Sequence, residues 1–226
     1  MTATNILVVA AHPDDEVLGC GGTIAGHADA GDVVRVLFLA DGVGARGEAR
    51  ADAQAGREKG AHSAAAILGV KRVDFLGLPD NRLDRLDLLD IVQPVERVVH
   101  EFRPSVVYTH HGGDLNVDHR IAHQAVLTAC RPQPKGSVLR ILCFETVSST
   151  EWGGPAIGPP FHPNWFVNIE DQLARKMAAL REYGEEMRPF PHARSIEAVE
   201  ALARLRGSSC GLPAAESFIL HREIKP

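Results

Sequence analysis

The 226-residue chain has only four cysteines, and their spacing excludes two common kinds of site. Cys20, Cys130, Cys143 and Cys210 lie far apart and form no C-x-x-C pair. Such a pattern supports neither a disulfide framework nor a zinc site built from thiolates. We expect most of these side chains to be small buried hydrophobes, as free cysteines usually are.

Long apolar runs and basic clusters are also missing. The apolar stretch over residues 6–11 is far too short to span a bilayer, and no basic leader precedes it. The net charge is -5 and the pI is about 6.1, with no basic run, which argues against a nucleic-acid partner. The composition therefore predicts a cytoplasmic protein without stable membrane insertion.

Strand-like and helix-like segments alternate along the chain. The expected strands cover residues 6–10, 33–40, 73–76, 106–109, 140–145, 165–169 and 217–220. The expected helices cover residues 15–30, 49–68, 85–102, 118–129, 171–183 and 195–206. This alternation predicts one α/β domain over residues 1–226, with a Rossmann-like, mostly parallel sheet flanked by helices. Residues from about 146 onward are expected to add loops, including a Gly- and Pro-rich one at 152–163, and C-terminal helices.

Polar residues gather where three of the expected strands end. The sequence AHPDDE at 11–16 follows the first strand, DG at 41–42 the second, and THH at 109–111 the fourth. In an open α/β sheet, ligands bind at the carboxyl ends of the strands. Imidazole and carboxylate groups together suit a divalent ion such as Zn²⁺.

His12 and Asp15 are candidate ligands for one metal ion. They stand three residues apart across a helix start, so they share one side of its first turn. Asp14 points elsewhere, within reach of a water molecule beside the metal. Capping of the helix by carboxylates is the simpler alternative, but it explains one acid rather than the whole run. Glu16 fits a helix-start charge or a contact behind the ligands as well as a catalytic role.

Several histidines compete to be the third ligand. His119 begins a helix, and Asp118 beside it is a candidate carboxylate for orienting its ring. His123 lies one turn further on and is more typical of a packing residue or of one that supports a ligand. His110 and His111 stand nearer the strand end, where they could bind substrate or pack locally.

These segments resemble the PIG-L/LmbE-like family of zinc-dependent N-deacetylases. The resemblance rests on AHPDDE at 11–16 with GCGG at 19–22, on DG at 41–42, on Arg57-Glu58 and on Asp118-His119. It covers most of the first 130 residues in the order found in the family. A dinucleotide loop is the weaker interpretation of GCGG, because these glycines fall inside a helix rather than in the turn after the strand.

The resemblance implies functions for individual residues. His12, Asp15 and His119 would be the zinc ligands, and such donors also accept Fe²⁺. Asp14 would be the general base. Arg57 matches an arginine that contacts substrate in the family.

The chain departs from the family at one motif. Many members have His-Pro-Asp-His where this chain has Asn116-Val117-Asp118-His119. The amide of Asn116 can donate a hydrogen bond to an oxyanion, but it cannot deliver a proton. We therefore hypothesise that His192 is the acid, because it lies in a polar, Pro-flanked setting before a helix, with His110 as the next candidate.

The predicted function is a zinc-dependent hydrolase that removes an acyl group, most simply acetyl, from an N-acylated amino sugar or glycoconjugate. Arg57, Asp41 and His110 are the candidate substrate-binding residues, although Asp41 with Gly42 equally fits a turn. One alternative is an amidase of the same fold that acts on a larger acyl conjugate, such as a mycothiol-type thiol conjugate. Another is a non-enzymatic Rossmann-like binding module. The resemblance further implies a homo-oligomer.

Overall fold

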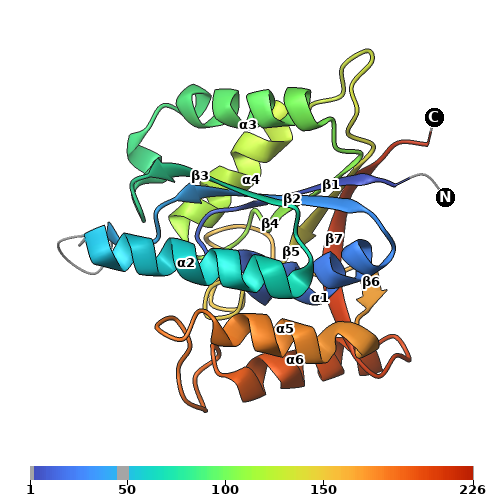
Figure 1. Ribbon diagram of the computed structural model, residues 1–226. Helices are drawn as coiled ribbons and strands as arrows, with labels where there is room; N and C mark the ends of the chain where they lie inside the picture. Colours follow the sequence, from blue (N-terminus) through green and yellow to red (C-terminus); the bar gives the residue numbers. More distant parts are fainter. Residues whose placement is uncertain (1–2, 45–50, 226) are drawn as a thin grey trace.

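The structure is a computed structural model that describes residues 3–44 and 51–225. These residues form one seven-stranded sheet with helices on both faces (Figure 1). The strand order is β3-β2-β1-β4-β5-β7-β6. The strands are β1 Asn5–Ala10, β2 Val33–Ala40, β3 Arg72–Leu78, β4 Val106–His110, β5 Arg140–Phe144, β6 Trp165–Asn168 and β7 Ala215–Glu223. The predicted α/β fold is confirmed.

The sheet reverses its direction of growth between β1 and β4. From β1 the chain proceeds through β2 to β3 on one side, and β4 then pairs with the other edge of β1. All pairs from β3 to β5 are parallel, whereas β7 runs antiparallel to both β5 and β6. The carboxyl ends of β1 and β4 therefore flank a crevice of the kind in which α/β sheets bind ligands.

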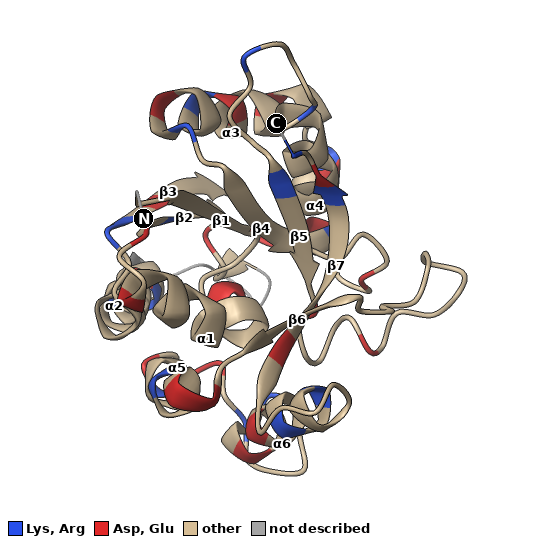
Figure 2. Cartoon of the chain, turned by 90° about the vertical axis from the view of Figure 1, so that its right-hand side faces the viewer, with Lys and Arg blue, Asp and Glu red and all other residues tan. Residues whose placement is uncertain are grey.

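Six α-helices cover the two faces of the sheet in the described residues. Helices α1 Asp15–Asp29, α2 Ala51–Leu68, α5 Leu173–Arg181 and α6 Ile196–Ser208 lie below it in Figure 1, and α3 Leu88–Phe102 and α4 Val117–Ala129 lie above it. Figure 2 shows the central strands mostly without charged residues, which lie mainly on helices and loops. None of these helices is long and apolar enough to cross a membrane.

The position of β1 inside the sheet explains why its sequence lacks an alternating pattern of apolar and polar residues. Ile6 and Val8 pack into a core beneath the sheet, whereas Leu7 and Val9 pack into a second core above it. All four side chains are fully buried. A strand covered on both faces has no solvent side, so every position is apolar.

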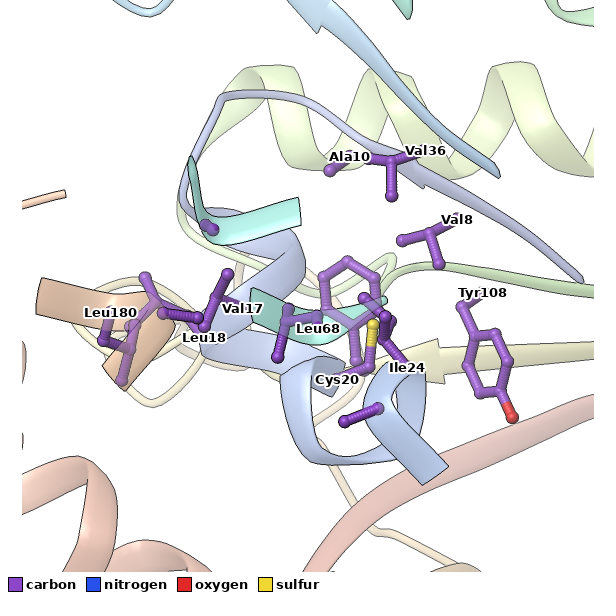
Figure 3. Close-up of a cluster of buried hydrophobic side chains, with 14 of the residues drawn as sticks. Val8, Ala10, Val17, Leu18, Cys20, Ile24, Val36, Leu68, Tyr108 and Leu180 are labelled. Carbon is purple, nitrogen blue, oxygen red and sulfur yellow. The ribbon is translucent and has the colours of Figure 1, made fainter. Parts of the chain in front are cut away.

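The core beneath the sheet receives most of α1 (Figure 3). Cys20 and Ile24 of α1 lie in it with Val8 of β1 and Tyr108 of β4. Three cysteines are buried, as expected, and Cys210 is exposed.

Helix α1 is interrupted at Cys20, where φ is -147° and ψ is 24°. The glycines around the interruption allow close packing, since a Cβ on Gly19 would overlap the Phe144 ring and one on Gly22 would lie 2.7 Å from Ile169. The GCGG segment is therefore a packing surface inside a helix. This agrees with the sequence interpretation that it is not a phosphate loop.

A buried ion pair fills the break in α1. The Glu216 carboxylate accepts hydrogen bonds from the backbone N–H groups of Gly22 and Thr23, at 2.9 and 2.7 Å. The Lys176 ammonium donates to the carbonyl of Leu18 at 2.9 Å and to Glu216 at 2.6 Å. A negative charge thus faces the start of the second half-helix and a positive charge the end of the first, as helix dipoles favour.

Element boundaries differ from the predicted ones at a few places. The helix expected over 85–102 begins only at Leu88, because Leu83–Arg85 forms a single 3-10 turn and Leu86 is extended. The helix expected over 171–183 begins with another such turn, Glu170–Gln172. Strand β7 is longer than expected because it pairs with both β5 and β6. Residues 49 and 50 of the expected second helix lie outside the described residues.

Candidate metal centre and active site

The candidate metal ligands come from two neighbouring strand ends. His12 and Asp15 lie in the turn between β1 and α1, and His119 lies in the first turn of α4, after β4. One ligand atom from each of the three side chains can be chosen so that all lie within 4.8 Å of one another. All three side chains are buried. The structure therefore brings together the three residues that the resemblance implied.

The unsatisfied atoms of this triad fit a cation. Asp15 Oδ1 and His119 Nε2 are buried and have no hydrogen-bond partner among the described residues. Leaving buried polar atoms without partners is costly, and a metal ion would satisfy both. Two imidazoles and one carboxylate form a ligand set that binds zinc at catalytic sites. The chemistry and the burial of the three residues thus fit the predicted metal.

Additional carboxylates hold the two histidines. Asp114 Oδ1 lies 3.1 Å from His119 Nδ1, and Asp118 Oδ2 and Asp80 Oδ1 each lie 3.1 Å from His12 Nε2. Such contacts fix the orientation of ligating imidazoles. The sequence analysis placed Asp118 beside His119, but the structure places it against His12.

Asp114 makes the contact with the His119 ring that the sequence analysis expected of Asp118. It accepts hydrogen bonds from the hydroxyl groups of Ser149 and of Thr150, the latter at 2.6 Å. Burial favours its neutral form, but these bonds and the facing His119 prevail and lower the pKa of Asp114 to about 2. Sequence reasoning missed this residue because it lies in a loop, where no periodicity shows which way a side chain points.

Asp14 is a buried carboxylate held by an arginine. It is 2% exposed, and its Oδ2 accepts a hydrogen bond of 2.7 Å from Arg194 Nη1. Arg57 Nη1 lies 3.8 Å from the same oxygen. Burial raises the pKa of Asp14 to about 6, although the arginines oppose the shift. Its φ of 133° is rare for a residue other than glycine and is typical of functional sites that the surrounding structure constrains.

Glu16 supports the turn that presents Asp14. Its carboxyl group accepts hydrogen bonds from the backbone N–H of Asp14, at 3.1 Å, and from the hydroxyl of Tyr183, at 2.6 Å. Burial raises the pKa of Glu16 to about 8. These contacts match the interpretation of Glu16 as a residue behind the site.

A polar cavity of about 270 Å³ opens above Asp14. Its volume is near the lower end of the range for small-molecule sites. Five of the predicted site residues line it: His12, Asp14, Arg57, Asn116 and His192. The others are Gly42, Asp80, Asn81, Ser148, Glu186, Arg188 and Arg194.

Arg57 joins three segments at the wall of the cavity. It donates to the carbonyl groups of Pro13 at 3.0 Å and Gly42 at 2.8 Å, and to Glu186 at 2.5 Å. Its side chain reaches the cavity from α2. The predicted contact with substrate is compatible with this position.

Asn116 and His192 lie on other parts of the wall. Asn116 caps α4 by accepting a hydrogen bond from the N–H of Asp118 at 2.8 Å, and its amide nitrogen donates to Asn81 at 3.2 Å. His192 is exposed, and its Nδ1 accepts a hydrogen bond from the N–H of Arg194 at 3.0 Å. Its Nε2 carries no hydrogen bond to the described residues, so it remains a candidate proton donor.

Six predicted residues do not line the cavity: Asp15, His119 and Asp118, which belong to the buried metal centre and its support, and His110, His123 and Asp41. His110 is fully buried, its Nε2 accepts from the N–H of Ala11 at 2.9 Å, and burial lowers its pKa. His123 hydrogen-bonds through Nδ1 to the carbonyl of His110 at 2.9 Å. Asp41 accepts from the N–H of Val43 at 3.1 Å, which is a turn contact. These contacts fit structural roles for His110, His123 and Asp41, so we assign none of them to catalysis or substrate binding.

Sequence reasoning missed several residues of the cavity. Arg194 contacts Asp14 across 180 positions of the chain, and Glu186 contacts Arg57 across 129. No spacing rule reveals contacts of this range. A sequence signal existed only for Asp80, because it follows the third expected strand as the polar clusters follow the others.

Comparison with known proteins decides the family. The sequence profile described as PIG-L, GlcNAc-PI de-N-acetylase, matches residues 7–130. The chain belongs to the PIG-L family. A relative in Escherichia coli K12, described as uncharacterized deacetylase YaiS, is 32% identical over 79% of this chain and 89% of its own length. The 1D-myo-inositol 2-acetamido-2-deoxy-alpha-D-glucopyranoside deacetylase of Rhodococcus erythropolis is 31% identical over 88% of this chain and 72% of its own length.

Solved structures agree with this PIG-L assignment. A conserved protein of Thermus thermophilus superposes with a TM-score of 0.77 at 27% identity, covering 99% of this chain and 97% of the other. The N,N'-diacetylchitobiose deacetylase of Pyrococcus horikoshii gives 0.78 at 22% identity, covering 97% and 84%, which shows the shared fold. The predicted family and fold are confirmed, and the names of the relatives support the predicted N-deacetylase activity.

Proposed function

We propose that this PIG-L protein is a zinc-dependent N-deacetylase that removes acetyl from an N-acetylated amino sugar of a small molecule or glycoconjugate. One observation carries the proposal: His12, Asp15 and His119 form a buried triad, and His12 and the buried carboxylate of Asp14 line the same polar cavity. The deacetylase names of relatives support the acetyl group and the amino sugar. A zinc ion in the triad would supply Lewis-acid chemistry to the amide carbonyl.

Asp14 is the general base in this proposal. In the described part of the chain, both of its arginine contacts use Oδ2, which leaves Oδ1 to accept a proton from the attacking water. A positioned base typically accelerates such a step by about 10²–10⁴-fold. The arginine contacts hold the carboxylate in one orientation, so it need not reorganise when the water reacts.

Asn116 and His192 complete the proposed reaction. The side-chain amide of Asn116 faces the cavity and can donate a hydrogen bond to the oxygen that becomes negatively charged. The C–N bond of the tetrahedral intermediate then breaks, and the departing amine takes up a proton. His192 Nε2 delivers it when the imidazole is protonated, a state in which Nδ1 no longer accepts from the N–H of Arg194. Asp14, which holds the proton of the water, is the alternative donor. Arg57 contributes to the wall that binds the sugar.

Acetate release tests the proposed activity. The wild-type protein loaded with zinc is expected to release acetate from N-acetylglucosamine or its glycosides. Asp14→Asn is expected to lower kcat by about 10²–10⁴-fold, the usual contribution of a general base, while the zinc content measured by atomic absorption stays the same. Asp90→Asn, an exposed position of α3, is the matched control and is expected to retain wild-type turnover.

Two outcomes would favour other functions. Turnover confined to substrates with larger acyl groups would indicate an amidase of the same fold. A protein without metal that releases no acid from any substrate, with or without added zinc, would indicate a binding module instead.

The role of His192 is tested separately. His192→Ala is expected to lower kcat by about 10²-fold, within the range for general acids, and to leave the zinc content unchanged. Intact turnover in this variant would assign the proton to Asp14. The change is suited to the test because the side chain is exposed and its loss leaves the core unaltered.

A further inference from the structure

A closed loop, residues 188–194, brings three basic side chains to one wall of the cavity. The N–H of Arg188 donates to the carbonyl of Arg194 at 3.2 Å, and the N–H of His192 donates to the carbonyl of Pro189 at 3.2 Å. Arg188, His192 and Arg194 all line the cavity. The backbone of the loop is therefore held closed at the wall of the cavity.

The acidic groups of the cavity already face basic partners. Asp14 pairs with Arg194 at 2.7 Å, and Glu186 pairs with Arg57 at 2.5 Å. Asp80, the third acid of the lining, lies 3.1 Å from His12. These three acids are buried.

Arg188 differs from the other two arginines of the cavity. It is exposed at the surface end of the wall, and it makes no ion pair with a carboxylate of the described residues. A negative group of a substrate that is buried against Arg188 would meet a positive charge that no carboxylate of the described residues neutralises. Arg57 and Arg194, in contrast, are paired with Glu186 and Asp14.

The hydrogen bonds of Arg188 leave one edge of its guanidinium available. Nη1 donates to the carbonyl groups of Glu185 at 2.6 Å and Met187 at 3.1 Å. Nε and Nη2, which together form the side edge of the group, donate to nothing in the described part of the chain. Arg57 and Arg194 have no such edge, because each uses two of its nitrogens on protein groups. A paired N–H edge matches the two oxygens of a carboxylate or phosphate.

We propose that Arg188 forms an anion subsite at the mouth of the cavity, and that the substrate carries a carboxylate or phosphate on the side of the sugar opposite its acetamido group. The inference rests on the proposed function, since it takes the acetamido group to lie at Asp14. The two backbone carbonyls hold the guanidinium before substrate arrives, so little side-chain entropy is lost on binding. Arg188 would then select among amino sugars by the charge of what is attached to them.

Kinetics with matched substrates test the subsite. The zinc-loaded enzyme is assayed for acetate release from three compounds: methyl N-acetylglucosaminide, an N-acetylglucosaminide of a hydroxy acid, and N-acetylglucosamine 1-phosphate. Arg188→Ala is expected to lower the ratio of kcat/KM for an anionic substrate to that for the neutral one by about tenfold or more, the effect of one hydrogen-bonded charge. Arg188→Lys keeps the charge but not the paired edge, and is expected to recover only part of the ratio. The preferred anion distinguishes a carboxylate from a phosphate.

The controls separate this inference from the proposed function. Arg204→Ala removes an exposed arginine of α6 that pairs with Glu200, and both the turnover and the substrate ratio are expected to remain as in wild type. An unchanged ratio in Arg188→Ala, with acetate released normally, overturns the subsite and leaves the deacetylase intact. If wild type releases no acetate, the proposed function fails, and calorimetry with N-acetylglucosamine 1-phosphate decides the subsite. Weaker binding to Arg188→Ala supports it, and equal binding overturns it.

Discussion

Single residues around Asp14 show how the protein keeps a charge inside its fold. A buried carboxylate without a partner is unfavourable, and Arg194 reaches it from the opposite end of the chain. The same arginine donates through Nε to the hydroxyl of Ser148 at 2.7 Å, so its guanidinium has a fixed direction. Ser148 itself has a φ of 63°, which places a second strained residue at the cavity.

Arg194 is therefore predicted to position the general base. Arg194→Met frees the side chain of Asp14, and misplacement by about 1 Å can cost about 10²-fold in rate. We expect kcat to fall by about 10–100-fold with a smaller change in KM, and Arg194→Lys to restore part of kcat. Steady-state kinetics of acetate release measure both constants. A loss confined to KM would show that Arg194 binds substrate instead.

The cysteines give a prediction that depends on pKa. Burial raises the pKa of Cys130 and of Cys143 to about 12, and raises that of Cys20 further above its usual range. At pH 8 these groups remain thiols, which react slowly. We expect a thiol reagent at pH 8 to modify one group rapidly, and Cys210→Ser to abolish that phase. Rapid modification of a second thiol in the native protein would contradict the burial of these side chains.

At the level of elements, the broken helix α1 connects the catalytic turn to the core. Its first half carries Asp15, and its second half lies among apolar side chains of the lower core (Figure 3). Lys176 of α5 and Glu216 of β7 satisfy the backbone groups exposed by the break. Two elements late in the chain thereby fix an element near its start.

Removing one partner of this ion pair is predicted to destabilise the fold. Lys176→Met leaves the Glu216 carboxylate buried and unpaired, which typically costs about 3–5 kcal/mol. Arg175→Met is the matched control, because Arg175 pairs with Asp29 at the surface, and the loss of such a pair costs about 0–1 kcal/mol. Urea unfolding measures both free energies. Equal stability of the two variants would show that the buried pair contributes no more than a surface one.

The sequence predicted elements better than the contacts between them. Residues 33–40 were assigned correctly as a strand because a run that is apolar at every position but Arg35 is typical of a buried parallel strand. Polar residues after β1 and β4 indicated the site, since the ends of parallel strands share one edge. Asp114 and Arg194 were missed because each acts from a loop. The direction of a loop side chain depends on tertiary packing, which leaves no pattern in the sequence.

At the level of the whole molecule, the proposed zinc site joins the two halves of the sheet. His12 and Asp15 follow β1, whereas His119 belongs to α4, after the chain has crossed to the other side of β1. An ion held by all three would therefore link two segments that lie about 100 residues apart in the chain. His12 and Asp118, the neighbour of His119, are 106 positions apart. Metal binding of this kind stabilises the folded state as a whole, because unfolded chains lack the assembled site.

Metal removal is accordingly predicted to lower the Tm. Zinc at about 1,000 times its Kd contributes about 4 kcal/mol, which corresponds to roughly 10 °C for a chain of this size. Differential scanning calorimetry of chelator-treated protein, before and after zinc is restored, measures the shift. His119→Ala provides the control, since without the third ligand the Tm should respond little to zinc. An equal response in wild type and in His119→Ala would place the metal elsewhere, because the stabilisation would then not depend on the residue that joins α4 to the turn after β1.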